Sequence, residues 1–397
     1  MRTLFLSPQP FFQERGTPIA VRLALEVLSK RSGDLIDLLV YHEGSNIEIS
    51  GVTVHRIPAL PFLNDIRPSI SCKKLLCDVI FFFSALNLIL RNRSRQFDLV
   101  HAVEESVFMA YFFKLIFGIP YVYDMDSSLS MQLTEKWALL KPLKPILSGL
   151  EKLAIKNSRA VVPVCDALAT IAENHGAPDM QIVRDISLLG EQSLHSETDL
   201  RAELKLSSDH EIVLYIGNLE SYQGIDLLID SFTFVAQSNS SAQLVIVGGS
   251  EQHIVSYKEK VQKLGLSQRI YLIGPRPVSA LRSLLLQADI LASPRTKGEN
   301  TPMKIYSYLH SGRAIVATNL PTNTQVLDQN TSKLTEPNPS AFGAAILILL
   351  QDPKLRRALG EAGYAQAEKK YTYDIFSKSL NALYDRIDTL KGTTLTQ

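Results

Sequence analysis

The sequence predicts an α/β protein built from two doubly wound, parallel-sheet domains in series. Its 397 residues exceed what one hydrophobic core ordinarily organises, so two domains are expected. Short apolar runs with strand character alternate with helical patterns along almost the whole chain, which is typical of βαβ units with helices on both faces of a parallel sheet. The alternation lapses in the polar stretch 187–208, which we interpret as the linker region between the domains.

The elements of each half follow from the spacing of the apolar residues. Strands are expected at 2–7, 35–42, 52–57, 97–102, 121–126 and 159–164, and then at 211–217, 242–249, 269–274, 289–294 and 313–318. Helical patterns separate them, and the tail from Ser340 reads as helical, with amphipathic pieces at 352–370 and 373–387. Ligands of such sheets bind outside the carboxyl ends of the strands, so the cleft between the two domains is the expected site.

The composition excludes several classes of protein. Hydrophobic residues make up 46% and charged residues 20%, which indicates a globular chain rather than a disordered one. The net charge of +1 provides no strong field to recruit nucleic acid. Cys72, Cys77 and Cys165 lack metal-ligand spacing and read as thiols of a reducing compartment. The first residues lack the pattern of a signal peptide, so we expect a cytoplasmic protein.

Two aromatic-rich segments of the first half, 73–95 and 107–118, allow two interpretations. The first segment carries an apolar run between basic flanks, but the run is shorter than the roughly twenty residues that a membrane span needs. Each segment could be a buried helix of a large core. Alternatively, the basic and apolar pattern fits a helix that lies on the inner surface of a membrane, near anionic lipid.

The loop after the first strand contains a candidate anion site. Thr17 is expected to cap a helix whose first residue is Pro18. Gly16 precedes that start and would let a ligand approach free backbone N–H groups. A well-capped helix without ligand is the alternative, but the length of the loop, with Phe11 and Phe12, favours a binding loop.

A second candidate is the segment "SPRTKGENTPMKIYSYLHSG", which runs from 293 to 312. Thr301 is expected as the N-cap of a helix and Pro302 as its first residue. Lys304 then lies in the first turn, where a cation is unfavourable to the helix dipole unless an anion also binds.

The charges around that helix start suit a sugar diphosphate. Arg295, Lys297 and Lys304 would bind the diphosphate, while Glu299 could accept hydrogen bonds from sugar hydroxyls. A solvated loop without function is the alternative. The stretch 215–228, "YIGNLESYQGIDLL", repeats the plan of strand, glycine, loop and helix at the start of the second domain.

These loops, in this order, resemble the group-1 (family-four) retaining glycosyltransferases of the two-Rossmann GT-B architecture. The resemblance rests on "GTP" at 16–18, "GNLESYQGIDLL", "LVIVGG", "ADILASP" and "GENTPMKIYSYLHSGRAIVAT", and it is strongest over 211–327. It implies two Rossmann-like domains that face each other across a cleft. Residues 1–190 would bind the acceptor, 191–371 would bind a nucleotide sugar, and 372–397 would form a helix that crosses back to the first domain.

The resemblance also implies the site residues. The catalytic candidates are Asp126, Glu299 and Lys304. The donor-binding candidates are Gly16, Thr17, Gly217, Asn218, Gln223, Arg295, Lys297, Asn300, Thr301, Pro302, Met303 and Ser307. No metal and no cofactor are expected, because the nucleotide sugar, UDP- or GDP-linked, is a substrate.

The sequence departs from the family pattern at several positions. The second glutamate of the family's pair is Ser307, and the Arg and Lys of its phosphate loop are Asn218 and Gln223. A histidine of the first domain corresponds to Asp126. Either Arg295, Lys297 and Lys304 take over the phosphate or catalysis is weakened or lost, and the intact loops favour the former.

Two further residues of the first domain have alternative interpretations. Asp124 and Asp126 match a D-x-D metal pattern, but that motif belongs to a different architecture, so Asp126 is expected to line the cleft. His101 also ends a strand and fits a structural or cleft-lining role better than a ligand role.

The predicted function is retaining glycosyl transfer from a nucleotide sugar to a lipid-linked or polysaccharide acceptor in cell-surface glycan synthesis. A membrane surface is a possible partner, and nucleic acid is not expected. The alternatives are a nucleotide-sugar epimerase of the same architecture and a non-catalytic nucleotide-sugar-binding or scaffold protein.

Overall fold

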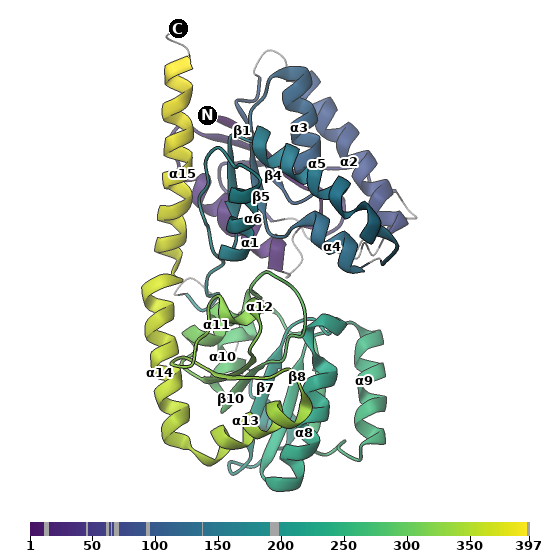
Figure 1. Ribbon diagram of the computed structural model, residues 1–397, viewed down its shortest axis with the longest axis vertical. Coiled ribbons are helices and arrows are strands. Elements are labelled where there is room, and N and C mark those ends of the chain that lie inside the picture. The colour runs from purple at the N-terminus through teal and green to yellow at the C-terminus, as the bar shows by residue number, and fades with distance from the viewer. Residues whose placement is uncertain are drawn as a thin grey trace. The chain divides into compact units, whose positions relative to one another are not determined.

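The computed structural model describes residues 1–11, 16–44, 47–60, 63–64, 66, 71–92, 96–136, 138–190 and 198–394. The chain divides into two compact units, one formed by Met1–Arg184 with Phe376–Gln397 and the other by Asp185–Ile375. Each unit contains its own parallel six-stranded sheet with helices packed around it (Figure 1). The two-sheet α/β architecture predicted from the sequence is confirmed.

The first sheet has the strand order β3-β2-β1-β4-β5-β6. Its strands are β1 (Arg2–Ser7), β2 (Leu35–Val40), β3 (Val52–Arg56), β4 (Leu99–Val103), β5 (Tyr121–Met125) and β6 (Ala160–Pro163). The helices of this unit are α1 (Gly16–Leu28), α2 (Cys72–Arg91), α3 (Ser106–Phe117), α4 (Leu129–Lys136), α5 (Lys144–Asn157) and α6 (Asp166–Asn174), with a 3₁₀ turn at Ala138–Leu143. The near-continuous apolar runs of β1 and β4 follow from their central place, since both faces of the sheet are covered there.

The second sheet repeats this topology, with the order β12-β11-β10-β7-β8-β9. Its strands are β7 (Glu211–Ile216), β8 (Ala242–Val247), β9 (Ile270–Gly274), β10 (Ile290–Ser293), β11 (Ala314–Thr318) and β12 (Lys333–Thr335). Its helices are α7 (Leu200–Leu204), α8 (Ile225–Ser238), α9 (Glu251–Lys263), α10 (Leu281–Leu286), α11 (Lys304–His310), α12 (Pro321–Thr324), α13 (Pro339–Gln351) and α14 (Pro353–Lys370). Part of the expected linker belongs to this unit, because Leu200 and Leu206 are buried in its core.

Both expected helix caps are corrected by the structure. α1 already includes Gly16, so Thr17 lies inside the first turn instead of capping it. α11 begins at Lys304 with Met303 at the cap position and no side-chain cap, so Pro302 precedes the helix. The Thr301 side chain is buried by tertiary packing, which overrides the local capping signal. Residue 12 of the first loop lies outside the described residues, and Phe11 is buried in the core.

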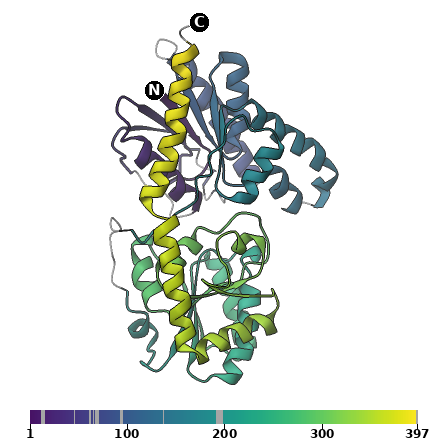
Figure 2. The ribbon, with the colours of Figure 1, turned by 60° about the vertical axis from the view of Figure 1, so that its left-hand side comes forward.

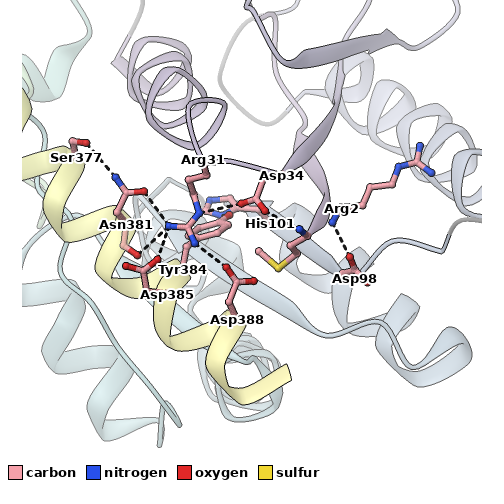
Figure 3. A network of polar contacts seen from close by, with 11 residues as sticks. Arg2, Arg31, Asp34, Asp98, His101, Ser377, Asn381, Tyr384, Asp385 and Asp388 are labelled. Atoms are coloured by element: carbon pink, nitrogen blue, oxygen red, sulfur yellow. Dashed lines mark hydrogen bonds and ion pairs between the residues drawn. The ribbon is translucent and has the colours of Figure 1, made fainter. Parts of the chain in front are cut away.

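The last helix, α15 (Tyr373–Thr394), returns to the first unit from Phe376 onward. Figure 2 shows it running along that unit. Arg31, which lies just beyond α1, attaches α15 to this unit. Its guanidinium forms ion pairs with Asp34 at 3.0 Å and, on α15, with Asp385 and Asp388 at 2.8 Å each (Figure 3). Asn381 accepts a further hydrogen bond from Arg31 at 3.1 Å. These contacts attach a segment distant in sequence to the first sheet.

Candidate functional site

Two loops of the second unit meet where the strand order of its sheet reverses. β7 and β10 are neighbours there, and in such sheets the loops that leave the carboxyl ends of these strands form the binding crevice. The loop after β7 covers 217–224 and the loop after β10 covers 294–303. They are joined directly, because the backbone N–H of Thr296 donates to the carbonyl of Tyr222 at 2.9 Å.

Gly224 permits this close approach. Its φ is +75°, and a Cβ atom there would overlap the carbonyl oxygen of Pro294 in the other loop. Only glycine combines this backbone conformation with so little space. Gly224, which the sequence marked as the end of the first loop, therefore permits a contact between the two loops.

Lys304, the first residue of α11, projects into the loop after β7. Its Nζ lies 3.0 Å from Oε1 of Gln223 and 3.9 Å from the ring centroid of Tyr215. A Cβ on Gly217 would lie 3.2 Å from the same nitrogen. The ammonium thus occupies a niche formed by an amide oxygen, an aromatic face and a glycine.

The electrostatics of this niche are unusual. Burial lowers the pKa of Lys304 well below its ordinary range, and the charge of Arg295 lowers it further. No ion pair joins Lys304 to a carboxylate among the described residues. A buried cation without a counter-charge is costly unless an anion binds beside it. The arrangement therefore fits an anionic ligand.

Arg295 organises the loop after β10. The residue is buried, its Nε donates to the carbonyl of Lys297 at 2.9 Å, and its Nη2 donates to Oδ1 of Asn300 at 2.9 Å. Its guanidinium carbon also lies 5.2 Å from the ring centroid of Tyr222. Part of the donor capacity of Arg295 is therefore spent on shaping its own loop.

Side chains near α12 anchor the backbone at residues 299 and 300. Gln325 donates to the carbonyl of Glu299 at 2.6 Å, and Thr322 donates to the carbonyl of Asn300 at 2.8 Å. Thr301 is only 3% exposed, and its hydroxyl has no hydrogen-bond partner among the described residues. The carbonyls of Glu299 and Asn300 are therefore fixed by side chains of the segment that follows β11.

Three other predicted donor residues have different surroundings. Asn218 is exposed and its side chain accepts from the N–H of Glu220 at 3.3 Å. Lys297 is exposed at the outer edge of its loop. Ser307 is buried, and its hydroxyl accepts from the N–H of Leu188 at 3.0 Å, so this position ties the start of the second unit to α11.

Tyrosines around this site were missed by sequence reasoning. The Tyr215 ring lies beneath Lys304, and its hydroxyl donates to the carbonyl of Asn218 at 2.6 Å. The hydroxyl of Tyr308 accepts from the N–H of Ile216 at 2.9 Å. Both side chains sit at ordinary core positions of a strand and a helix, so no pattern in the sequence distinguishes them.

The first unit holds the remaining predicted residues, Asp126, Gly16 and Thr17. Asp126 directly follows β5 and is half-buried, Gly16 is exposed, and Thr17 is half-buried. His101 of β4 is buried, with Nδ1 2.8 Å from the hydroxyl of Tyr384 and Nε2 3.1 Å from Asp124. This polar chain links α15 to β5.

Glu104 is a second residue of this unit that the sequence did not reveal. It follows β4 with a φ of +49°, an uncommon conformation for a residue other than glycine. Burial raises the pKa of its carboxyl group, with Lys74 opposing and Asp124 adding to the shift. Within the described ranges, no group of three or more His, Cys, Asp or Glu side chains is arranged to hold a metal ion.

Solved structures identify the class of this fold. The chain aligns with sucrose-phosphate synthase from Thermosynechococcus elongatus at a TM-score of 0.80 and 19% identity, covering 98% of this chain and 99% of that one. It also aligns with Anabaena Alr3699/HepE in complex with UDP-glucose at a TM-score of 0.73 and 16% identity, covering 97% and 100%. The fold is that of the GT-B glycosyltransferases.

Residues 196–366 match the family described as glycosyl transferases group 1, so the chain carries a group-1 glycosyltransferase domain. Among curated relatives, the alpha-D-kanosaminyltransferase of Streptomyces kanamyceticus is 22% identical over 85% of this chain and 89% of its own length. The phosphatidyl-myo-inositol mannosyltransferase of Mycobacterium leprae is 27% identical, over 45% of this chain and 47% of its own length. The chain thus spans less than half of the latter relative.

Proposed function

We propose that this protein transfers a sugar from a nucleotide-sugar donor, with retention at the anomeric carbon, to a lipid-linked or polysaccharide acceptor in cell-surface glycan synthesis. The observation that carries the proposal is the ammonium of half-buried Lys304, which has Gln223 and Tyr215 beside it and no carboxylate partner among the described residues. A donor diphosphate supplies the missing negative charge. The bound UDP-glucose of the Anabaena structure and the phosphatidyl-myo-inositol specificity in the name of the mycobacterial relative support the donor and acceptor classes.

Lys304 takes the role that the altered phosphate loop leaves open. In the resembling family, the loop after the first strand of this domain provides the cations, but here it provides Asn218 and Gln223. Lys304 reaches the side chain of Gln223 from a different element, at 3.0 Å. The cation is therefore provided by α11, and it contacts the residue that stands at the position of the lost loop cation.

The reaction chiefly requires stabilisation of the leaving diphosphate. Glycosyl transfer passes through an oxocarbenium-like state, and preorganised cations and N–H groups lower its free energy as charge develops on the phosphate. Lys304 and Arg295 provide that charge. Glu299 accepts hydrogen bonds from sugar hydroxyls, and the Thr301 hydroxyl donates a hydrogen bond to the nucleotide sugar. The leaving phosphate takes the proton of the acceptor hydroxyl, so no side chain has to act as a base.

A non-catalytic nucleotide-sugar-binding protein is the second candidate. The observation that favours it concerns Ser307, which stands where the family has its second glutamate. Its hydroxyl accepts a hydrogen bond from the N–H of Leu188. Such a protein would bind a nucleotide sugar through Lys304 without cleaving it.

Titration calorimetry with UDP- and GDP-sugars, combined with an assay for released nucleotide, separates these functions. We expect saturable binding of one nucleotide class and slow release of nucleotide to water. Nuclear magnetic resonance of the released sugar then reports whether the anomeric configuration is retained. Binding without release would favour the non-catalytic protein, and absence of binding to every donor would refute both candidates.

A further inference from the structure

Three helices of the first unit form one outer layer. α2, α3 and α5 lie side by side in Figure 1, and their inner residues join the same core cluster. Phe82 of α2 packs on Phe112 of α3 with ring centroids 5.4 Å apart. Segment 73–95 was expected to be either a buried helix or a helix on a membrane surface. In the structure, one face of α2 is buried in the core. The buried residues of that face are Cys77, Phe81, Ala85 and Ile89. Residues 93–95 of the segment lie outside the described residues.

The outer surface of this layer is also apolar. On α2, Leu75 and Phe83 are 63% and 61% exposed, and on α3 and α5 Leu115 and Ile146 reach 64% and 61%. Their neighbours at helical spacing extend each stripe. The remaining exposed apolar residues of the layer are Leu76, Val79, Leu90, Phe112, Ile116, Leu150 and Leu153. So many exposed apolar side chains on one layer of helices mark an interaction site.

The exposed charges of the same layer have a single sign. All residues of these three helices are described, and their only carboxylates are Asp78 and Glu151. Asp78 pairs with Lys74 at 3.4 Å, and buried Glu151 accepts from Ser130 at 2.8 Å. The exposed charged residues of the layer are all basic, namely Lys73, Arg91, Lys144, Lys152 and Lys156. Since the whole chain has a net charge of only +1, this positive surface is local.

We propose that the outer surface of α2, α3 and α5 docks on an anionic lipid bilayer, with the apolar stripes in the interface and the lysines at the head groups. Exposed apolar side chains and exposed basic side chains on the same helices match the chemistry of that surface. A second copy of the chain fits less well, because a two-fold contact would place this basic surface against itself. None of the described helices is long and apolar enough to cross a membrane, so the helices lie on the bilayer. This inference stands on the first unit alone and does not depend on the donor site.

Co-sedimentation of the full chain with vesicles tests the proposal. Vesicles of phosphatidylglycerol and phosphatidylcholine are compared with vesicles of phosphatidylcholine alone, at low and high salt. We expect binding to the anionic vesicles only, weakened by salt because head-group attraction is screened. Val79→Glu places a carboxylate in the apolar stripe and should lower the partition coefficient by about tenfold or more.

Matched variants outside the layer provide the controls. Val255 on α9 has a similar exposure, 53% against 48% for Val79, so Val255→Glu makes the same chemical change elsewhere. Lys152→Glu and Lys258→Glu form the corresponding pair for charge, since both lysines are exposed on helices. Thermal melting of all four variants checks that each is folded.

Each outcome decides the proposal. Selective loss of vesicle binding in Val79→Glu and Lys152→Glu supports it. Absence of binding to anionic vesicles at low salt would overturn it, and so would equal loss in the Val255 and Lys258 variants. Analytical ultracentrifugation that shows a dimer broken by Val79→Glu, without vesicle binding, would assign the surface to a second copy instead.

Discussion

The Nζ atom of Lys304 lies 3.0 Å from Oε1 of Gln223, although 81 positions separate these residues in the chain. α11 provides the cation and the loop after β7 provides the acceptor, so the pair joins the two loops of the proposed donor site. No described carboxylate pairs with this half-buried ammonium, which is unfavourable in the free protein. Function and stability should therefore oppose each other at this position.

Lys304→Met is expected to lower activity and raise stability. Removal of the cation should lower turnover by about a hundredfold, as loss of one transition-state donor does. The free protein should become more stable by about 1 kcal/mol, because an apolar side chain replaces a half-buried charge that has no described counter-charge. Urea denaturation and donor-release kinetics measure the two effects. Lys258→Met on exposed α9 is the control, and unchanged turnover in Lys304→Met would remove the residue from the site.

Nucleotide binding should be accompanied by proton uptake. Burial and Arg295 lower the pKa of Lys304 in the free protein, and a bound diphosphate would raise it again. Between the two pKa values, the free protein lacks a proton that the complex holds. Calorimetry in buffers of different ionisation enthalpy measures this proton, and Lys304→Met should abolish it. Binding with the same proton count in both proteins would contradict the assignment.

The same shift predicts how stability depends on pH. The unfolded chain keeps the lysine proton up to about 10.5, whereas the folded protein releases it earlier, so unfolding takes up a proton in between. The free energy of unfolding should therefore rise with pH from the lowered pKa toward 10.5, relative to Lys304→Met. Below the lowered pKa the difference between the two proteins should be constant. Urea unfolding of both proteins across this range measures the slope, and parallel profiles throughout would refute the prediction.

Gly224→Ala should be more damaging than Gly265→Ala, although both glycines have positive φ, +75° and +70°. Alanine at either position is strained by about 1 to 2 kcal/mol. At Gly224 the added Cβ also overlaps the carbonyl of Pro294, while nothing lies within 4 Å at Gly265. The excess loss of stability measures the loop contact, and only Gly224→Ala should weaken nucleotide binding. Equal effects in both variants would show that the loops can separate freely.

Arg31→Ala should loosen the attachment of α15. Arg31 is 14% exposed and bonds three carboxylates, whereas Arg22 is 52% exposed and, among the described residues, pairs only with Glu26 of the same helix. We expect a loss of about 2 kcal/mol for Arg31→Ala and within about 0.5 kcal/mol for Arg22→Ala. Urea denaturation gives the free energies, and limited proteolysis should cut α15 faster in Arg31→Ala. Identical digestion of both variants would count against this role.

Tyr384→Phe tests the chain of polar contacts behind β5. The change removes the hydroxyl that lies 2.8 Å from Nδ1 of buried His101 and leaves that nitrogen without its partner. A cost of about 1 to 3 kcal/mol is expected. Tyr364→Phe, at a 46% exposed position of α14, should be neutral. Thermal unfolding compares the two, and a neutral Tyr384→Phe would mean that the hydroxyl contributes nothing to the docking of α15.

The sequence alone determined the two parallel sheets and the order of their elements along the chain, except for β12, which was not expected. The apolar runs of β1, β4, β7 and β10 are long and uninterrupted because both faces of each central strand are covered, so local composition already carried that information. It also marked the two loops of the second unit, through Gly217, Gly224 and the charges of 295–304. Strand ends and glycines are local features, so the positions predicted for them are also found in the structure.

The tertiary structure decided what the sequence could not. It withdrew the cap expected at Thr17, because α1 already includes Gly16, and the cap expected at Thr301, because burial of that side chain overrides a local hydrogen-bond preference. It paired Lys304 with Gln223 and Tyr215, and it turned half of α2 outward beside α3 and α5. Such contacts join residues far apart in the chain, and their geometry depends on how whole elements pack, which no local pattern encodes.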